Sequence, residues 1–386
     1  MTEIQKKYLK YKQKYINLKK TIGGGINASY VKKGNTLTLR YKSKDGIDHE
    51  IKYTIKEKIG EGAYGEVDLI EKNDDTTKQY IFKKGTRDTP EVFNEGLQSD
   101  MLEGILDPDM LVLFQGSNET DFLISTYNGD DLKKAFMHDM QKTKDKYATT
   151  TIQLLELLHK INSHNIFHND IKLANITIND EDKVYLIDFG FLTRGKSNAG
   201  SLASMSFMGV ITFLEEYNFN RYEKTFSYLK TILKNTDIIA FFYCCIHLLF
   251  LSNGQTSSSS TGLLYKLQVY DFEELSMNNL FTLYYFILPT SIRNTIPDID
   301  MQSNDECDPI FSNSSYAKSI FGDFSDDNIN LFRFMAYIYD KLNIGLNSIQ
   351  QTWYIEFLKI MSTCFLPDFD YDKFKPIFNE IVLQFK

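Results

Sequence analysis

The feature of this sequence that most constrains its fold is a pair of short strand-like segments with polar residues at both ends. The segment HNDIKLANITI (168–178) is followed by KVYLIDFG (183–190), and the polar residues 179–182 between them predict a turn. Thirteen positions separate Asn175 from Asp188. A hairpin with this turn returns both side chains to the same end of the paired strands. The chain is therefore expected to build a polar site at that end.

The polar groups of this hairpin suit phosphate chemistry assisted by a metal ion. A carboxylate from Asp188 and an amide oxygen from Asn175 are ligands that Mg²⁺ accepts. Asp170 is placed to accept a hydroxyl proton, and Lys172 can neutralise charge on a moving phosphoryl group. His168 is predicted instead to hold the shape of the loop through hydrogen bonds to backbone.

A glycine-rich segment, GEGAYGEV (60–67), lies between two strand-like runs. It fits G-x-G-x-x-G-x-V, with glycine at Gly60, Gly62 and Gly65 and valine at Val67. Glycines allow backbone N–H groups to approach phosphate oxygens closely. An ordinary glycine-rich hairpin turn would look the same, so both interpretations stay open. A dinucleotide-binding turn is disfavoured because a strand follows, where that motif needs a helix.

A lysine follows about 20 residues later in YIFKK. Side-chain alternation puts Phe82 and Lys83 on opposite faces of the strand, so Lys83 faces the cleft if Phe82 faces the core. Lys84 is the alternative. A buried lysine needs a counter-charge, and Glu95 in VFNEGLQ offers one. A solvated Glu95, or a register in which Gln98 takes its place, remains open.

The rest of the pattern predicts an α+β protein. Alternating segments at 36–41 and 47–59 flank Asp45-Gly46, a strong hairpin signal. Further strand-like runs and a helix at about 90–104 continue to about residue 126. From Leu132 onward helical periodicity dominates. We expect a small antiparallel β-rich part with one main helix, followed by a larger, mostly helical part.

The N-terminus carries a basic, heptad-patterned segment. Seven lysines lie within residues 1–22, and apolar residues from Ile4 to Ile22 recur in steps of four and three. Glycines 23–25 follow, so residues 1–25 are interpreted as a helix with a glycine joint. A helix docked on its own domain and a surface for self-association or a partner through residues 4–22 both remain open.

Composition excludes some classes of protein. A net charge of −8 over 386 residues argues against a general nucleic-acid binder. Cys244, Cys245, Cys307 and Cys364 show no metal-ligand spacing, which favours buried thiols in a reducing compartment such as cytoplasm. The N-terminus has no apolar segment typical of a signal peptide. The longest apolar run, 238–251, has 14 residues. A membrane span needs about 20, so a buried helix is expected.

Taken in order, these motifs resemble those of the eukaryotic-type protein kinase family, over roughly residues 55–385. The spacing within HNDIKLAN and on to D-F-G matches the family pattern without a gap. The resemblance implies a two-lobed kinase fold. An extra hairpin (26–58) would lead into the N-lobe (59–126), and the helical C-lobe would follow (127–386).

The resemblance also implies the chemistry, transfer of the γ-phosphoryl of ATP to serine or threonine hydroxyls of proteins, with Mg²⁺. The implied residues are Gly60, Gly62, Gly65 and Val67 over the ATP phosphates, Lys83 paired with Glu95 at the α/β-phosphates, Asp170 as base, Lys172 at the γ-phosphoryl, and Asn175 and Asp188 on Mg²⁺. Adenine is expected at the link near residues 125–128. Lys172, two positions after the aspartate, is typical of serine/threonine kinases.

Further residues follow from the same resemblance, some of them departures from it. The apolar run resembles the family's central buried helix, with Asp237 as its anchor to the catalytic loop. Asn169 stands where the family has an arginine that reads a phosphate in the activation loop, so activity independent of phosphorylation in 191–206 is expected. No A-P-E follows D-F-G. Ser99, four positions after Glu95, replaces a usual apolar residue.

Two other functions are compatible with part of the pattern. A pseudokinase scaffold would be expected to lack an ATP or metal residue, and none is missing. Small-molecule kinases of the choline- or aminoglycoside-kinase type share the H-x-D, Asn and Asp core and lack A-P-E, but Lys172 and the full glycine motif favour protein substrates. The lysine-rich N-terminus and the Asn/Ile/Lys-heavy composition resemble proteins encoded by giant DNA viruses.

Overall fold

The structure is a computed structural model that describes residues 28–43, 45–62, 65–85, 91–117, 120–137, 139–195, 235–252, 291, 314–342 and 347–385. The chain divides into two compact units. The β-rich unit comprises Met1–Gly129 and Tyr185–Leu192, and the helical unit comprises Asp130–Val184 and Thr193–Lys386. The expected N-terminal helix, its glycine joint and Cys307 lie outside the described residues.

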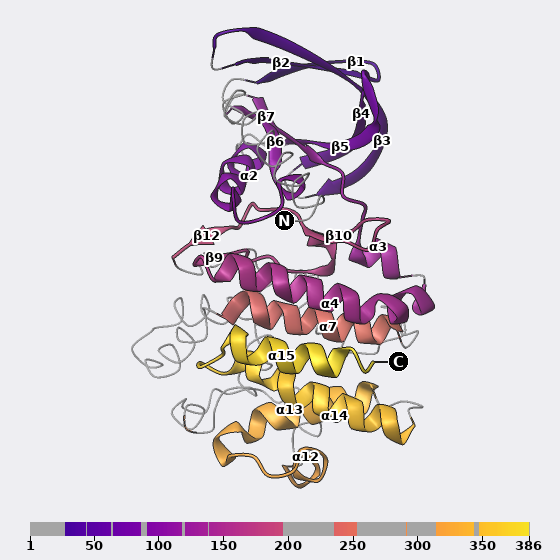
Figure 1. The fold of residues 1–386 in the computed structure, drawn as a ribbon, viewed down its shortest axis with the longest axis vertical. Coiled ribbons are helices and arrows are strands. Elements are labelled where there is room, and N and C mark those ends of the chain that lie inside the picture. Colours follow the sequence, from indigo (N-terminus) through magenta and orange to yellow (C-terminus); the bar gives the residue numbers. More distant parts are fainter. Residues whose placement is uncertain are drawn as a thin grey trace, which may run out of the picture. The chain divides into compact units, whose positions relative to one another are not determined.

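A seven-stranded antiparallel sheet forms the β-rich unit, in the order β1-β2-β3-β4-β5-β7-β6 (Figure 1). Its strands are β1 (Ser29–Lys33), β2 (Thr36–Lys42), β3 (Asp48–Gly62), β4 (Gly65–Lys72), β5 (Asp75–Gly85), β6 (Val112–Ser117) and β7 (Thr120–Thr126). The hairpin expected around Asp45-Gly46 is present, because β2 and β3 pair from Thr36↔Thr54 to Lys42↔Asp48. The single long strand β3 joins this hairpin to the glycine motif.

The core of the β-rich unit is built from the inward-facing residues of these strands. Leu37 and Leu39 of β2 are fully buried beside Phe82 and Phe122. Burial of side chains this size stabilises a fold by about 1.5–3 kcal/mol each. The hairpin ahead of the glycine motif therefore belongs to the core of the sheet. Because Phe82 faces this core, its neighbour Lys83 faces the opposite side.

The helix of the β-rich unit is shorter than the sequence predicts. Helix α2 spans Glu91–Ser99, so the expected end at residue 104 is wrong. A 3-10 turn covers Asp100–Leu102, and Gly104 has a left-handed backbone with φ of 79°. The Ser99 hydroxyl accepts a hydrogen bond of 3.1 Å from the Val112 N–H of β6. This long-range contact ties the helix end to the sheet, and periodicity does not encode it.

The helical unit contains two long helices that lie side by side, α4 (Met140–Asn162) and α7 (Thr236–Ser252) (Figure 1). Its other described helices are α3 (Leu132–Phe136), α12 (Ser314–Phe321), α13 (Ile329–Leu342), α14 (Ser348–Ser362) and α15 (Tyr371–Val382). Nearly every residue of α7 is buried, including Cys244 and Cys245, which confirms the buried helix expected from the apolar run. Within the described residues, no helix has the length and apolar character that a membrane crossing requires.

Short strands frame the loops of the helical unit. They are β8 (Asp130–Asp131), β9 (Ile166–Phe167), β10 (Ile176–Ile178), β11 (Val184–Leu186) and β12 (Thr193–Arg194), with β11 running on into the β-rich unit. The turn predicted at residues 179–182 is present, because the Asp182 N–H donates to the Asn179 carbonyl at 3.0 Å. An antiparallel β-rich part with one main helix, followed by a helical part, confirms the expected fold class.

Candidate active site

The glycine motif is the hairpin turn between β3 and β4. Gly60 pairs with Val67, and Gly62 pairs with Gly65; the two residues at the tip lie outside the described residues. A side chain on Gly65 would place its Cβ 2.3 Å from the Lys84 carbonyl oxygen, so only glycine fits there. At Gly60 the same atom would make an ordinary 3.7 Å contact with Val67. Packing therefore explains Gly65 and does not explain Gly60.

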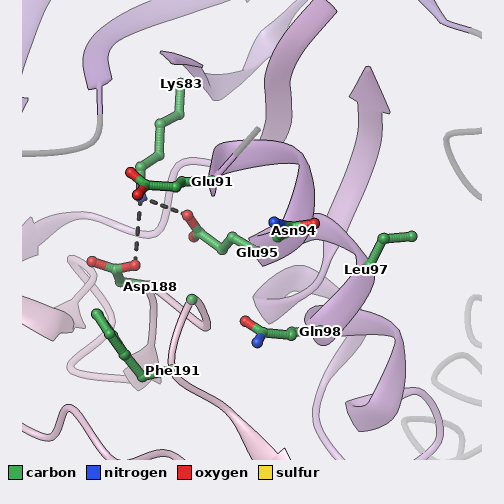
Figure 2. A pocket seen from close by; sticks show the side chains of 9 residues that line it. Lys83, Glu91, Asn94, Glu95, Leu97, Gln98, Asp188 and Phe191 are labelled. Carbon is green, nitrogen blue, oxygen red and sulfur yellow. Dashed lines mark hydrogen bonds and ion pairs between the residues drawn. The ribbon is translucent and has the colours of Figure 1, made fainter. Parts of the chain in front are cut away.

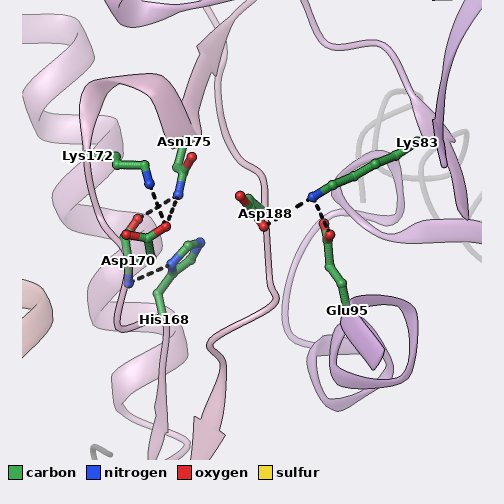
Figure 3. Close-up of polar contacts among 7 residues, drawn as sticks. All are labelled: Lys83, Glu95, His168, Asp170, Lys172, Asn175 and Asp188. Carbon is green, nitrogen blue, oxygen red and sulfur yellow. Dashed lines mark hydrogen bonds and ion pairs between the residues drawn. The ribbon is translucent and has the colours of Figure 1, made fainter. Parts of the chain in front are cut away.

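A charged cluster lies on the face of the β-rich unit opposite its core. The Lys83 Nζ lies 2.5 Å from Glu95 Oε2 on α2 and 3.4 Å from Asp188 Oδ1 (Figure 3). The Lys83 side chain is 16% exposed and that of Glu95 is 8% exposed, so the contact is shielded from water. Lys84 is exposed. Of the two candidate lysines, Lys83 is thus the one that meets a helix carboxylate.

The electrostatics of the cluster depend on burial and on the two carboxylates. Burial alone would lower the pKa of the Lys83 ammonium, but Glu95 and Asp188 outweigh burial and raise it above its ordinary value. Burial raises the pKa of the Glu95 carboxyl, while Lys83 pulls it down. The 2.5 Å contact suits a charge-assisted hydrogen bond, so Lys83 and Glu95 face each other as an ammonium and a carboxylate. One ammonium facing two carboxylates favours an additional cation.

A pocket of about 440 Å³ opens between α2 and the segment that contains Asp188 (Figure 2). Gln98 lines it from α2, and Gly190 and Phe191 line it from the other side. With its amide nitrogen assigned toward the D-F-G backbone, Gln98 donates at 2.7 Å to the carbonyls of both Phe189 and Gly190. Gln98 therefore contacts the D-F-G backbone, while Glu95 contacts Lys83.

The second cluster lies in the helical unit, in the loop 168–175 between β9 and β10. Asp170 is almost fully buried, and its Oδ2 accepts hydrogen bonds from Lys172 Nζ at 2.8 Å and from Asn175 Nδ2 at 2.7 Å (Figure 3). Asn175 Nδ2 also donates to the Asp170 carbonyl at 2.9 Å. The carboxylate is thus fixed by two side chains of its own loop.

The backbone of this loop is held by the buried carboxylate of Asp237. Asp237, at the start of α7, is fully buried and accepts from the N–H groups of His168 and Asn169, each at 2.8 Å. The anchor expected at Asp237 is therefore present. His168 Nδ1 lies 3.3 Å from the Asp170 N–H. This contact suits the loop-shaping role expected for His168.

Each of the two clusters contains an oxygen atom of the kind that a hard divalent cation accepts. Asn175 turns its amide nitrogen toward Asp170, which leaves its amide oxygen on the other side (Figure 3). Asp188 contributes a carboxylate from the β-rich unit, where its backbone adopts a left-handed conformation with φ of 63°. Mg²⁺ binds through one or two such oxygens and keeps several waters. In the described residues no group of three or more His, Cys, Asp or Glu side chains offers a metal site made entirely by protein.

Some contacts at the site were not expected from the sequence. Asn169 Nδ2 donates to the Thr193 hydroxyl at 2.9 Å, which ties the loop 168–175 to β12. Asn162, at the end of α4, donates to Asp237 at 2.9 Å. Each contact joins residues far apart in the chain, and no local spacing marks it. A left-handed backbone at Asn169, with φ of 61°, is a conformation that asparagine tolerates well.

The sheet with its single main helix, the helical unit and these two clusters define the class of the protein. Residues 53–214 match the family model of the protein kinase domain. The match begins on β3, ahead of the glycine motif, and extends beyond D-F-G. Residues 53–214 of this chain are thus similar to the protein kinase domain, and the structure has the kinase fold.

The relatives of known name are distant serine/threonine kinases. Serine/threonine-protein kinase 36 of Mus musculus is 28% identical over 160 residues, which cover 40% of this chain and 12% of that protein. Serine/threonine-protein kinase 32C of Mus musculus is 22% identical over 175 residues, covering 44% and 36%. Extracellular signal-regulated kinase 2 of Dictyostelium discoideum is 31% identical over 175 residues, covering 42% and 46%. The chain spans less than half the length of each of these relatives.

Proposed function

We propose that the protein is an active kinase that transfers the γ-phosphoryl group of Mg-ATP to serine or threonine hydroxyls of proteins. The observation that carries the proposal is the ion pair of Lys83 with Glu95, together with the 3.4 Å contact of Lys83 with Asp188. In protein kinases this ion pair and the metal-binding aspartate must both be in place for transfer. A chain that only binds partners has no need to keep them.

The proposal gives each cluster a separate task on one nucleotide. Lys83 would bind the α/β-phosphates, and backbone N–H groups of the glycine hairpin would face phosphate where Gly60 lacks a side chain. Asp188 and Asn175 would hold Mg²⁺, which neutralises charge on the transferring group. Asp170 would take the proton of the substrate hydroxyl, and Lys172 beside it would stabilise the phosphoryl charge.

The choice of substrate is supported by the catalytic loop and by the relatives. Lys172 lies 2.8 Å from Asp170, the placement expected of a serine/threonine kinase. The relatives described above are named serine/threonine kinases or a signal-regulated kinase. A reducing cytoplasmic location and a viral origin are proposals that rest on sequence alone.

We propose further that activity does not require a phosphate in residues 191–206. The Asn169 amide donates to the Thr193 hydroxyl at 2.9 Å, and β12 pairs with β9 through Thr193↔Phe167. A neutral hydrogen bond thus joins the catalytic loop to the segment after D-F-G, at the position where the family uses an arginine and a phosphate.

The test compares the intact protein with the Asp170→Asn variant. Each is incubated with radiolabelled ATP, Mg²⁺ and a panel of generic proteins. The variant keeps an oxygen that can accept from Lys172 and Asn175 but loses the base, so transfer should fall by about 10²–10⁴-fold. ATP binding and the melting temperature are measured in parallel and should change little.

Each outcome of this test selects one function. Label in protein that is lost in the variant supports the proposal. ATP binding without transfer would identify a scaffold and contradict it. Label that appears only in an added aminoglycoside or choline would identify a small-molecule kinase.

A further inference from the structure

The last described helix of the chain reaches the hydrogen bonds beneath the catalytic loop. Tyr371, the first residue of α15, donates its hydroxyl to Asn162 Oδ1 at 2.6 Å, although 209 positions separate the two residues. Asn162 is the last residue of α4. The start of α15 therefore meets the end of α4 through a hydroxyl–amide contact.

The Asn162 amide has only one orientation that satisfies its neighbours. Its Nδ2 donates to the Ile166 carbonyl and to Asp237 Oδ2, both at 2.9 Å. Its Oδ1 faces the Tyr371 hydroxyl, which can donate. A rotated amide would turn its oxygen toward a carbonyl and a carboxylate, neither of which carries a proton to donate. Tyr371 thus satisfies the one atom of the amide that the catalytic-loop side leaves unmatched.

The same carboxylate that accepts from Asn162 holds the catalytic loop. Asp237 Oδ2 also accepts from the His168 N–H, and Oδ1 accepts from the Asn169 N–H, each at 2.8 Å. The next residue along the chain is Asp170. The contacts therefore form an unbroken path of hydrogen bonds from Tyr371 to the backbone beside Asp170.

The surroundings of Tyr371 fix its ring and keep its proton. The His159 ring stacks on it, with centroids 4.9 Å apart and ring planes 4° apart. Burial raises the pKa of the Tyr371 hydroxyl well above its ordinary value, and the negative charge of Asp237 adds to the rise. The hydroxyl therefore keeps its proton at neutral pH and can donate it to Asn162.

We propose that Tyr371 is a positioning residue for the catalytic loop, acting through Asn162 and Asp237. Its kinetic consequence rests on the proposed kinase activity, while its structural consequence does not. Residue 371 lies outside the segment 53–214 that matches the kinase family model, so similarity to the family does not assign it this role. The proposal makes α15 part of the apparatus that holds the reacting residues.

The test uses Tyr371→Phe, which removes only the hydroxyl. Tyr316→Phe is the matched control, because the Tyr316 hydroxyl donates to Asp340, between α12 and α13 and away from the catalytic loop. A third variant, Asn162→Asp, keeps the shape but turns a carboxylate oxygen toward Asp237. In each protein we would measure hydrogen exchange of the amides of residues 168 and 169, and then kcat and the KM for ATP.

In Tyr371→Phe, exchange at residues 168 and 169 should rise about five- to tenfold, as expected for the loss of one hydrogen bond's support. The kcat should fall by about the same factor, with the KM for ATP unchanged. In Asn162→Asp, the rise in exchange and the fall in kcat should both be larger. In Tyr316→Phe, neither the exchange rates nor kcat should change.

The inference is overturned if exchange at residues 168 and 169 stays at the wild-type rate in Tyr371→Phe while only amides of α15 exchange faster. It is also overturned if Asn162→Asp loosens the loop and Tyr371→Phe does not, because Asn162 would then suffice alone. If the wild-type protein transfers no phosphate, the proposed function fails, and the exchange rates still decide the role of Tyr371.

Discussion

The two clusters of functional residues are assembled in different ways. In the β-rich unit, Lys83, Glu95 and Asp188 come from a strand, a helix and a segment 105 positions beyond Lys83, and the Lys83 ammonium contacts both carboxylates. In the helical unit, Asp170 is held by Lys172 and Asn175 of its own loop. The first cluster depends on tertiary structure, whereas the second depends on local sequence.

The units also differ in how they bury groups that titrate. The β-rich unit buries charges in pairs, as at Lys83 and Glu95. The helical unit contains a histidine buried without charge, since burial and then the charge of Lys133 lower the pKa of His247 to about 4. Substitution of Lys83 and titration of His247 should therefore destabilise the protein in opposite ranges of pH.

The largest effect on stability is expected for Lys83→Met. The substitution leaves two carboxylates facing each other without their cation, and breaking such a pair costs about 3 kcal/mol or more of the free energy of unfolding. Burial already raises the pKa of Glu95, and loss of Lys83 raises it further. The cost therefore grows as the pH rises above the ordinary pKa of a carboxyl, because folding then leaves Glu95 charged without a partner or forces it to take up a proton, and the cost shrinks as the pH falls.

Urea unfolding of the wild-type and Lys83→Met proteins at pH 7.5 and pH 5.5 would measure this effect. Lys83→Met/Glu95→Gln serves as the control and should recover part of the loss. Equal stability of all three proteins at pH 7.5 would show that the pair is not shielded from water as described.

The next effect concerns His247 in the helical unit. In the folded protein the pKa of His247 is about 4, below the ordinary value of 6.5, so the unfolded chain binds the extra proton more readily. Neutral His247 contributes its full share to the free energy of unfolding above pH 6.5. This share is lost as the pH falls toward 4, by about 3 kcal/mol in total. In His247→Gln, the fall in melting temperature between pH 6.5 and pH 4.5 should be much shallower. Parallel curves for the two proteins would contradict the lowered pKa.

The smallest effect is expected for the neutral hydrogen bond between Asn169 and Thr193, which stands where the kinase family uses an arginine and a phosphate. Thr193→Val keeps the shape but removes the hydroxyl that accepts from Asn169. Loss of one neutral hydrogen bond costs about 1 kcal/mol, so kcat should fall by about fivefold or less.

Phosphatase treatment of the wild-type enzyme should leave its activity unchanged. Loss of activity on that treatment would show that a phosphate, and not Thr193, orders this segment.

The same contrast explains what the sequence could predict. The polar cluster in the loop 168–175 could be predicted because its residues interact across a few positions. Phe82 and Lys83 could be assigned to opposite faces by strand alternation. The end of α2 at Ser99 could not be predicted, since it depends on a contact with Val112 of β6. The Tyr371–Asn162 hydrogen bond could not be predicted either, because it joins residues that lie 209 positions apart.

The central claim is that the two clusters act on one nucleotide and one metal ion. A crystal structure of the protein with Mg²⁺ and a non-hydrolysable ATP analogue tests it most directly. The account predicts Lys83 on the α/β-phosphates, and one Mg²⁺ bound by both Asp188 and Asn175 with Asp170 facing the γ-phosphate. A nucleotide bound away from Lys83, or a metal ion that contacts neither Asp188 nor Asn175, would contradict it.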